Sequence, residues 1–387
     1  MFLREPLESI SAPATDPRAA HVPVLASLTI TAARPPRPRP DLPSRTDQPL
    51  APVRPTCYRL AMRVLAGDIG GTKTLLAVLE QRPDGRLDVL TRQRYESAGH
   101  PGLAPIVRDF LGRADVPALT RAGFGVAGPV VDRSSRVTNL PWQIDADALA
   151  GELGLQSVAL VNDFAAVALG LRVLGPEDLE VLQEGERDPN GPIALIGAGT
   201  GLGEAVLVPT PAGPRFLASE GGHCDLAPRN ELEIALLRFL LGRHHRVSYE
   251  RIVSGPGLVT AYQFVVAEGL EPELSDTRAR MATEDPGAVI GARALAGDDP
   301  ACVRAVDIFL DLYGAEAGNL ALKVLPTGGL FVAGGIAGKL LPKVRDGRFL
   351  RAFRDKGRMS PLLHEMYVAV IKNADVGLLG AGLAGLA

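Results

Sequence analysis

The sequence predicts an α/β protein made of two related halves. Short apolar runs that indicate buried strands alternate with segments of helical periodicity, which is typical of α/β folds. A glycine-rich turn joins two such runs at residues 65–80, and a second one does so at residues 193–208. A strand–turn–strand unit that occurs once in each half indicates a duplicated domain. The 387 residues are enough for two domains with substantial cores.

The first glycine-rich turn lies within LAGDIGGTKTLLAVLE, residues 65–80. The turn at Gly70, Gly71 and Thr72 would bring backbone N–H groups and a hydroxyl close to Asp68. Glycine allows an anion to approach the backbone, and a carboxylate can hold Mg²⁺ directly or through water. The turn therefore predicts a phosphate-binding loop beside a metal-binding carboxylate. A plain Asp-Gly-Gly hairpin without chemistry is the alternative.

The first half continues with alternating strands and helices. Residues 86–96 predict a third strand, and apolar residues at helical spacing between 103 and 111 predict an amphipathic helix. Residues 124–131 predict a buried strand that ends in Gly-Pro. A helix is expected over residues 145–153, with Asp145 as its N-cap. This order of elements is typical of the start of an α/β domain.

A second focal point is the junction between a strand at residues 158–161 and a helix at residues 164–174. Asn162 and Asp163 stand between these elements, at the carboxyl edge of the predicted sheet. Open α/β folds bind their ligands at this edge, which makes Asp163 a candidate functional carboxylate. The alternative is that Asp163 only caps the helix that follows it.

The second glycine-rich turn, in IALIGAGTGLGEAVLV at residues 193–208, repeats the pattern of the first. Two such loops predict a nucleotide between the halves. The pattern is not a Walker A loop, because Lys-Ser/Thr does not follow the glycines, and a strand follows where a Rossmann fingerprint needs a helix. Residues 329–335 predict a late buried strand that opens onto Gly334 and Gly335. That turn could let an adenine or a ribose approach the backbone, or simply begin a helix.

A short loop at residues 219–228, SEGGHCDLAP, collects Glu, His, Cys and Asp side chains. Glu220 and His223 can exchange hydrogen bonds with vicinal hydroxyls, so the loop suits polar sugar recognition. Zinc is disfavoured because no second cluster stands at ligand spacing. A structural loop with solvated side chains is the alternative.

Further helices are expected at residues 231–241, from 298 to about 325, and at the small, apolar carboxyl end, 376–387.

Composition argues against several classes of protein. The chain has 46% hydrophobic and 22% charged residues and a net charge of −3, so it carries no basic footprint for nucleic acid. No apolar run reaches the roughly 18 residues needed to span a bilayer. The cysteines, Cys57, Cys224 and Cys302, are odd in number and far apart, so neither a disulfide framework nor a cysteine zinc site is expected. A reducing cytoplasm is the expected compartment.

Residues 1–61 differ in character from the rest of the chain. They hold 12 of the 32 prolines, include the run PPRPRP and show no sustained periodicity. We interpret them as a disordered Pro/Arg-rich extension or as a misassigned start, with Met62 as the true beginning. A docking tail is the functional alternative. The apolar stretch at residues 22–33 follows acidic rather than basic residues, which disfavours a signal peptide.

Taken together, these stretches resemble the bacterial-type glucokinases of the hexokinase, Hsp70 and actin superfamily. The likeness runs from about Arg63 to the end of the chain and leaves residues 1–61 outside. Eight motifs occur in the order of the family: GDIGGTK from Gly67, LVNDFAA from Leu160, GAGTGLG from Gly197, EGGHCDLAP from Glu220, YERIVSGPGL from Tyr249, FVAGGI from Phe331, FRDKGRM from Phe353 and GLLGAG from Gly377. Each motif alone is weak, but eight in order are specific.

The resemblance implies a fold and an activity. The fold is the two-domain actin-like ATPase (RNase H-like) fold, an α/β architecture with a cleft between a smaller and a larger domain. The smaller domain would comprise residues 62–173 plus 373–387, and the larger one residues 174–372. The implied activity is that of an ATP-dependent glucokinase of glycolysis, which uses Mg²⁺ and no zinc. The resemblance also suggests a homodimer, and no nucleic acid or membrane is expected as a partner.

The resemblance further implies a role for each residue of the site. Asp163 is the general base that takes the proton from the 6-hydroxyl of glucose, and Asp68 anchors the Mg²⁺ of MgATP. The residues implied in sugar binding are Asn139, Asn162, Asp163, Glu220, His223 and Glu250. The residues implied in nucleotide binding are Asp68, Gly70, Gly71, Thr72, Lys73, Gly199, Thr200, Gly201, Gly334 and Gly335.

Several alternatives stay open. The chain could phosphorylate another hexose or an amino sugar, or use polyphosphate, because residues 220–223 do not settle the epimer or the donor. Ser219 and Leu226 also depart from the family pattern beside the sugar loop, which bears on the identity of the sugar. A sugar-responsive regulator would need an N-terminal helix-turn-helix, which the Pro-rich residues 1–61 cannot form. An Hsp70-like or actin-like nucleotide machine would leave the sugar-binding set unexplained. The related repressor–kinase family carries a Cys-rich zinc motif, whereas Cys224 stands alone here.

Overall fold

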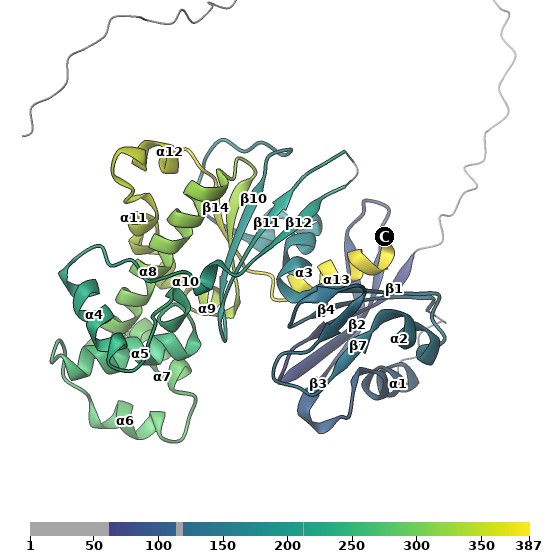
Figure 1. The fold of residues 1–387 in the computed structure, drawn as a ribbon, viewed down its shortest axis with the longest axis horizontal. Helices are drawn as coiled ribbons and strands as arrows, with labels where there is room; N and C mark the ends of the chain where they lie inside the picture. The colour runs from purple at the N-terminus through teal and green to yellow at the C-terminus, as the bar shows by residue number, and fades with distance from the viewer. Residues whose placement is uncertain (1–61, 114–118, 212) are drawn as a thin grey trace, which may run out of the picture. The chain divides into compact units, whose positions relative to one another are not determined.

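The computed structural model describes residues 62–113, 119–211 and 213–387, which belong to one compact unit, Tyr58–Ala387. The unit contains two large sheets and the helices that pack on them (Figure 1). The interpretations of residues 1–61, including the misassigned start and the place of Cys57, lie outside the described residues. Among the described residues, the helices are all too short or too polar to cross a bilayer.

The first sheet has five strands in the order β3-β2-β1-β4-β8. They are β1 (Arg63–Ile69), β2 (Lys73–Gln81), β3 (Leu87–Glu96), β4 (Arg121–Val126) and β8 (Ser157–Asn162). β1 and β2 form an antiparallel hairpin that β3 extends, whereas β4 and β8 run parallel to β1. The parallel strands end together at one edge of the sheet, where Ile69, Val126 and Asn162 are in register.

The second sheet repeats this arrangement and adds one strand, in the order β12-β11-β10-β13-β14-β9. Its strands are β9 (Leu179–Gln183), β10 (Ile193–Ala198), β11 (Leu202–Val208), β12 (Arg215–Ser219), β13 (Gly329–Ala333) and β14 (Val368–Ile371). β10 and β11 form the hairpin, β12 extends it, and β13 and β14 are parallel to β10. β9 pairs antiparallel with β14 at the far edge. The shared strand order confirms the predicted duplication.

Two helices and a small sheet pack with the first sheet. The helices are α1 (Leu103–Arg113) and α2 (Ala146–Leu153), and the small sheet consists of β5 (Val130–Val131), β6 (Ser134–Arg136) and β7 (Gln143–Asp145). Their shared core includes Phe110, Phe124 and Trp142, whose indole N–H donates to the carbonyl of His100 at 3.0 Å. As predicted, Asp145 caps α2, because its Oδ1 accepts from the N–H of Ala148 at 2.8 Å.

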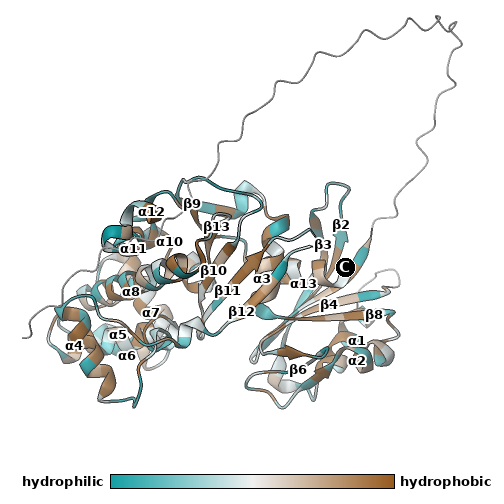
Figure 2. Cartoon of the chain, turned by 45° about the horizontal axis from the view of Figure 1, so that its top comes forward, coloured by the Kyte–Doolittle hydropathy of each residue, from teal (hydrophilic) through white to brown (hydrophobic). Residues whose placement is uncertain are grey.

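The helical region of the second half is larger. Its helices are α4 (Glu231–Leu241), α5 (Gly255–Ala267), α6 (Ser275–Met281), α7 (Pro286–Ala296), α8 (Pro300–Val324), α9 (Gly335–Lys339), α10 (Leu341–Arg345), α11 (Arg348–Arg354) and α12 (Ser360–His364). α8 packs against α5, α7 and α11. Its Tyr313 hydroxyl accepts from the N–H of Ala198 at 3.0 Å, which ties α8 to β10. Figure 2 shows that β4, β10 and β13 are predominantly hydrophobic, as strands buried on both faces should be.

Two helices each pack on the sheet of the other half. α3 (Asp163–Gly170) follows the last parallel strand of the first sheet, and α13 (Val376–Leu386) follows that of the second. α3 nevertheless contributes Phe164 and Ala168 to a core with β10 and β11, and α13 contributes Leu378 and Leu379 to a core with β1 and β2. α3 and α13 also pack on each other (Figure 1). The predicted carboxyl-terminal helix is thus confirmed as a docked helix.

Glycine makes the close packing of α13 possible. A Cβ added at Gly380 would overlap the carbonyl oxygen of Ala166 on α3. On the sheet side, a Cβ added at Gly123 of β4 would overlap the carbonyl oxygen of Ala381. The small, apolar composition of residues 376–387 is therefore a packing requirement, because the backbones themselves are in contact.

Most elements predicted from the sequence are present, some with shifted ends. The helix predicted at residues 231–241 is α4, and the one predicted from 298 is α8. The strand predicted at 124–131 is wrong in its extent, because β4 ends at Val126 and Pro129 cannot donate to a continuing ladder. The helix predicted at 164–174 ends at Gly170, and a 3₁₀ turn, Leu171–Val173, follows it.

Candidate active site

The carboxyl edge of the first sheet brings two aspartates together across a glycine. In the parallel register, Asp68 of β1 stands beside Gly125 of β4, which stands beside Val161 of β8. Asp163 follows two residues later, at the start of α3. A Cβ added at Gly125 would lie 3.0 Å from the Cβ of Ala166 and 3.8 Å from the Cα of Asp163, so glycine permits the close packing of β4 against the start of α3.

Asn162, and not Asp163, is the N-cap of α3. Its Oδ1 accepts from the N–H groups of Phe164 at 2.9 Å and Ala165 at 3.2 Å. Its Nδ2 donates to the carbonyl of Gly128 at 3.1 Å and to Oδ1 of Asp163 at 2.9 Å. The amide of Asn162 therefore makes all four hydrogen bonds of which it is capable, and it orients the neighbouring carboxylate.

The carboxylate of Asp163 is held through one oxygen only. Oδ1 accepts from Asn162 Nδ2 and from the N–H of Phe164 at 2.8 Å. Within the part of the chain that the structure describes, Oδ2 accepts no hydrogen bond from a protein group. Burial raises the pKa of Asp163 above its ordinary value, against the two hydrogen bonds, and the charge of Glu220 raises it further. Asp163 thus has the features of a general base: a fixed orientation, an open oxygen and increased basicity.

Asp68 is also shifted toward its protonated form. Its side chain reaches solvent, but protein atoms surround the carboxylate, and this lost hydration raises its pKa to about 6. The charge of Asp163 is the second cause. A carboxylate in this setting would gain from a divalent cation, since the cation would neutralise it.

The first glycine turn lies against the loop of Asn139. The N–H of Gly70 donates to the carbonyl of Lys73 at 2.9 Å and closes the turn. A Cβ added at Gly71 would lie 2.7 Å from the carbonyl oxygen of Thr138 and 3.4 Å from the Cβ of Asn139. Among the described residues, the N–H groups of Gly71 and Thr72 have no backbone or side-chain acceptor, and both Thr72 and Lys73 are exposed. The turn therefore presents free donors to solvent.

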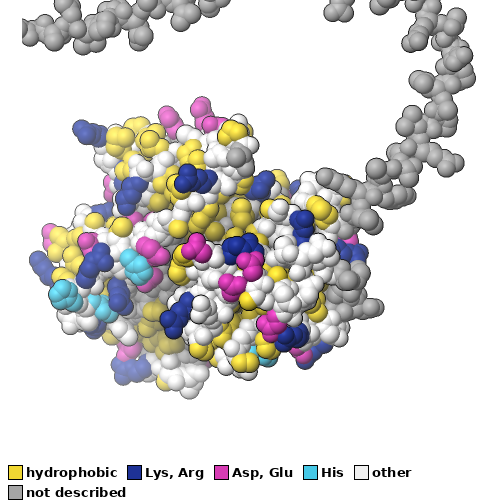
Figure 3. Space-filling model, turned by 45° about the vertical axis from the view of Figure 1, so that its right-hand side comes forward, with side chains coloured by type: hydrophobic (Ala, Val, Ile, Leu, Met, Phe, Trp, Pro, Cys, Tyr) yellow, Lys and Arg dark blue, Asp and Glu magenta, His cyan; other side chains and the backbone are white. Residues whose placement is uncertain are grey.

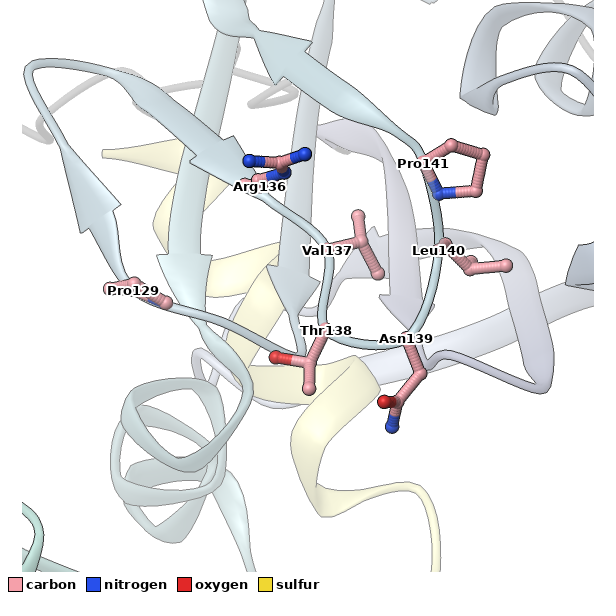
Figure 4. A pocket seen from close by; sticks show the side chains of 7 residues that line it. All are labelled: Pro129, Arg136, Val137, Thr138, Asn139, Leu140 and Pro141. Carbon is pink, nitrogen blue, oxygen red and sulfur yellow. The ribbon is translucent and has the colours of Figure 1, made fainter.

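Asn139 stands at the tip of its loop with a left-handed backbone, φ 64°, a conformation that Asn tolerates better than most residues. Its side chain is exposed and lines a shallow pocket (Figure 4). The other residues that line this pocket are Pro129, Arg136, Val137, Thr138, Leu140 and Pro141. The remaining predicted site residues do not line it, so Asn139 reaches the candidate site only through its contact with the first glycine turn.

The second glycine turn is tied to two neighbouring segments. The N–H of Gly199 donates to the carbonyl of Gly201, and its carbonyl accepts from the N–H of Gly255, both at 2.8 Å. Gly334, at φ 87°, lies so close that an added Cβ would overlap the carbonyl oxygen of Ala198. Gly335 then begins α9. In the described chain, the N–H groups of Thr200 and Gly201 have no protein acceptor, as in the first turn.

Glu250 joins the second glycine turn to the loop of Glu220 and His223. Its Oε2 accepts from the N–H of Leu202 at 3.0 Å, and its Oε1 lies 3.8 Å from Nδ1 of His223. Nε2 of His223 lies 4.0 Å from Oε2 of Glu220, whose side chain is 92% exposed. Three polar side chains thus converge with their outer atoms free to bind a ligand.

Sequence reasoning missed the residues that hold this loop in place. The carbonyl of Cys224 accepts from the N–H of Tyr249 at 3.0 Å, which joins the loop to the turn that carries Glu250. Arg246 donates to the carbonyl of His223 at 2.9 Å and pairs with Asp225 at 2.7 Å. No signal in the sequence points to Arg246, because a single arginine in a loop has no periodicity or motif of its own.

The described residues contain no group of three or more His, Cys, Asp or Glu side chains arranged to hold a metal ion. Cys224 is free and exposed, and Cys302 is free and buried. On the face of the molecule shown in Figure 3, acidic, basic and apolar side chains are interspersed.

Comparison with solved structures defines the class of fold. A glucokinase from an Antarctic psychrotroph is 30% identical, with a TM-score of 0.73, and the match covers 84% of this chain and 98% of that chain. A ROK family glucokinase from Streptomyces griseus, solved with glucose and AMPPNP, is 24% identical with a TM-score of 0.58, over 84% and 99% of the two chains. At that identity the second likeness concerns the fold alone. The fold is the actin-like ATPase fold of the sugar kinases, as predicted.

Comparison with sequences defines the family. The family model described as Glucokinase matches residues 65–386. A glucokinase from Nostoc sp. is 48% identical over 334 residues, which cover 83% of this chain and 98% of that protein. A glucokinase from Synechocystis sp. is 44% identical over 347 residues, which cover 84% and 98%. This chain belongs to the glucokinase family, which confirms the resemblance inferred from the eight motifs.

Proposed function

We propose that this chain transfers the γ-phosphoryl group of ATP to the 6-hydroxyl of glucose, with Asp163 as the general base. Membership in the glucokinase family supports the reaction. One observation carries the role of Asp163: one carboxylate oxygen is fixed by two donors, the other is open, and burial raises the pKa. The charge of Asp163 also acts on Asp68, and the charge of Glu220 acts on Asp163, which supports a shared site.

The chemical step follows from this arrangement. Oδ2 of Asp163 takes the proton of the 6-hydroxyl as the sugar oxygen bonds to the γ-phosphorus. The bond between the γ-phosphorus and the oxygen that bridges it to the β-phosphate breaks, and ADP leaves with the electron pair. The hydrogen bonds from Asn162 and Phe164 keep the carboxylate in place throughout, so orientation is provided before the substrate binds.

We assign sugar binding to the polar side chains around Asp163. Glu220, His223 and Glu250 would bind ring hydroxyls; His223 lies 4.0 Å from Glu220 and 3.8 Å from Glu250. Asn139 and Asn162 would bind hydroxyls near the base, although Asn162 must then exchange one of its four protein hydrogen bonds for one to the sugar. Such a site would discriminate against a sugar that lacks a hydroxyl, because the matching polar side chain would lose its hydrogen-bond partner in the complex.

We assign nucleotide binding to the two glycine turns. The free N–H groups of Gly71, Thr72, Thr200 and Gly201 would bind phosphate oxygens, with Gly70 and Gly199 shaping the turns. Lys73 would add a positive charge, and Gly334 with Gly335 would lie along the adenosine.

Asp68 fits a Mg²⁺ site. Its carboxylate is poorly hydrated and repelled by Asp163, and Mg²⁺ needs only one or two carboxylates together with water and substrate phosphates. When bound, Mg²⁺ would neutralise charge that develops on the phosphates.

We further propose that the enzyme is a cytoplasmic glycolytic homodimer, as the sequence resemblance suggests. Light scattering of the purified protein measures its oligomeric state.

The test is ADP formation by the purified protein with MgATP and a panel of glucose, mannose, fructose, galactose and N-acetylglucosamine. We expect turnover with glucose and a loss of about 10² to 10⁴ in kcat for Asp163→Asn. Asp145→Asn is the matched control, because Asp145 also lies at a helix start but caps α2 away from the site. Turnover with another sugar alone would reassign the substrate, and an active Asp163→Asn variant would overturn the assigned base.

A further inference from the structure

A carboxyl group lies directly beneath the loop that carries Glu220 and His223. Glu204 of β11 is only 4% exposed and pairs across the ladder with Ser219, the last residue of β12. A Cβ added at Gly221 would overlap Oε2 of Glu204. The hydroxyl of Ser219 in turn accepts from the N–H of Gly221 at 3.0 Å. The loop therefore rests with its backbone on the carboxyl group of Glu204.

Glu204 meets a second buried carboxyl group. Glu316 of α8 is 1% exposed, and its carboxyl group lies close enough to that of Glu204 for each to shift the pKa of the other. Ionised carboxylates only accept hydrogen bonds, so a bond between two of them needs a proton on one. Without that proton, the Oε1 atoms of both residues are buried with no hydrogen-bond partner among the described residues. Two buried negative charges so close together would be strongly unfavourable.

The proton belongs to Glu204. Glu316 accepts from Nδ2 of Asn319 at 2.8 Å and lies 3.9 Å from Nζ of Lys323, and both contacts favour its ionised form. In the part of the chain that the structure describes, no side chain donates a hydrogen bond to Glu204, although the charge of Lys323 acts on it. Burial first, and the charge of Glu316 second, raise the pKa of Glu204 to about 8.

The same cluster reaches the segment that carries Glu250. Nδ2 of Asn319 donates to the hydroxyl of Tyr249 at 3.2 Å, and Tyr249 immediately precedes Glu250 in the 3₁₀ turn. Nζ of Lys356, in the FRDKGRM motif, donates to Oδ1 of Asn319 at 2.7 Å and to the carbonyl of Ala315 at 2.8 Å. One buried polar cluster thus supports both segments that carry the proposed sugar-binding side chains.

We propose that Glu204 and Glu316 are positioning residues of the sugar site: a carboxyl pair with one shared proton that sets the loop of Glu220 and His223 against the turn of Glu250. This inference rests on the proposed function. Neither residue touches the substrate, so both act through the loop, and the shared proton makes their effect dependent on pH.

The direction of that dependence follows from the groups that face the pair. These groups are Lys323, Lys356, Tyr249 and Tyr313; burial raises the pKa of both tyrosines and lowers the pKa of Lys356. Glu204 is therefore the group whose ionisation falls near pH 8. Above that pH, a second negative charge under Gly221 repels Glu316, and the loop loses its support. We expect the KM for glucose to rise while the KM for ATP stays constant.

Three variants test the proposal. Glu204→Gln keeps a neutral group that donates to Glu316 and cannot lose a proton. Glu316→Gln removes the carboxylate that would accept the hydrogen bond from protonated Glu204. Glu233→Gln is the matched control, because Glu233 of α4 is equally buried but pairs with Arg229 rather than with Glu204 or Glu316. Thermal unfolding at each pH verifies that every variant is folded.

Steady-state kinetics between pH 6.5 and 9.5 give the first measurement. In the wild type, we expect the KM for glucose to rise by about tenfold above pH 8, since a displaced loop misplaces its hydrogen-bonding groups. The rise should vanish in Glu204→Gln and persist in Glu233→Gln. Glu316→Gln should raise the KM for glucose at every pH. A pH profile of Glu204→Gln that matches the wild type would overturn the proposal.

Amide hydrogen exchange of residues 219–226 gives a second measurement that needs no turnover. After correction for the intrinsic rate, exchange in this segment should increase above pH 8 in the wild type and in Glu233→Gln, but not in Glu204→Gln. Absence of turnover with glucose would reject the proposed function alone, whereas unchanged exchange across this pH range would reject the positioning pair.

Discussion

The two sheets share a strand order, but their hairpin turns differ in chemistry. Asp68 stands two residues before the first glycine of its turn, at Gly70, and Gly197 stands two residues before Gly199 in the other. The first turn therefore carries a carboxylate where the second has no side chain. In the second sheet, the ring of Phe164 occupies that space: a Cβ added at Gly197 would lie 2.8 Å from its Cε2 atom.

From this difference we infer that the two halves of the duplicated fold carry different functional groups. In the proposed function, the first half would supply the charged groups of the chemical step, Asp68 and Asp163. The second half would supply backbone donors from its turn and the sugar candidates around Glu250. Phe164, which follows Asp163, packs on the second sheet, so the position of the proposed base depends on both halves.

The largest effect expected from this comparison is that of Asp68→Asn. Loss of the carboxylate that would hold Mg²⁺ should lower kcat by about 10² to 10³, with partial recovery at high Mg²⁺. The apoprotein should become more stable at pH 7. The pKa of about 6 exceeds the ordinary 3.8, so the folded state loses stability as the pH rises from 3.8 to 6, and asparagine removes this loss.

Kinetics at several Mg²⁺ concentrations and thermal unfolding without nucleotide measure these two effects. If Asp68→Asn kept wild-type kcat, the two turns would be chemically equivalent and the comparison would fail.

The next largest effect concerns the exchanged helices. Gly380→Ala should lower the free energy of unfolding by about 3 kcal/mol, because the added methyl group would overlap the backbone of Ala166. Gly377→Ala in the same helix is the control, since its nearest atom would be Val167 Cγ2 at 3.7 Å. The free energy of unfolding of the control variant should stay unchanged or rise by about 0.5 kcal/mol, because alanine has the higher helix propensity. Urea denaturation measures both variants, and equal effects would refute close contact between α3 and α13.

A smaller loss of stability is expected for Gly197→Ala. The new methyl group would press on the ring of Phe164 and on the carbonyl carbon of Ala333, at 2.8 Å and 3.2 Å, and should cost about 2 kcal/mol. Gly199→Ala, where no atom lies within 4 Å, provides the comparison within the same turn. A Gly197→Ala variant as stable as the wild type in urea would mean that Phe164 is not seated on this glycine.

The last expected effect concerns the buried pair and accumulates over several pH units. The pKa of Glu204, about 8, lies above its ordinary 4.5, so the folded state binds a proton that the unfolded state has lost. Stability should fall by at most about 1.4 kcal/mol per pH unit between 4.5 and 8, and level off above pH 8. Glu204→Gln should flatten this slope in urea denaturation between pH 5 and 9. An equal slope in both proteins would contradict the assigned proton.

The sequence predicts the features that depend on neighbouring residues. Apolar spacing located α4, and the Asp145 cap lies beside its helix, so both could be identified locally. The repeated glycine turns revealed the duplication for the same reason. At the strand end of β8, Asn162 and Asp163 can both cap a helix, and the backbone geometry selects Asn162. The assigned roles of the site residues stay predictions until the variants are measured.

Features that depend on distant residues could not be predicted. Glu204 and Glu316 belong to different elements, and neither has a motif that indicates its partner. The exchange of α3 and α13 between the sheets is set by contacts among glycines and carbonyl oxygens, which carry no periodic signal. β9 joins the edge of the second sheet for a similar reason, since its partner β14 lies far along the chain.

The most direct test of the account compares Asp163→Asn with Glu250→Gln in steady-state kinetics with glucose at saturating MgATP. The division between the halves predicts that Asp163→Asn lowers kcat by about 10² to 10⁴ and changes the KM for glucose little. Glu250→Gln should raise that KM by about tenfold or more with a smaller loss of kcat. The account would be contradicted if Asp163→Asn kept its kcat, or if Glu250→Gln left the KM for glucose unchanged.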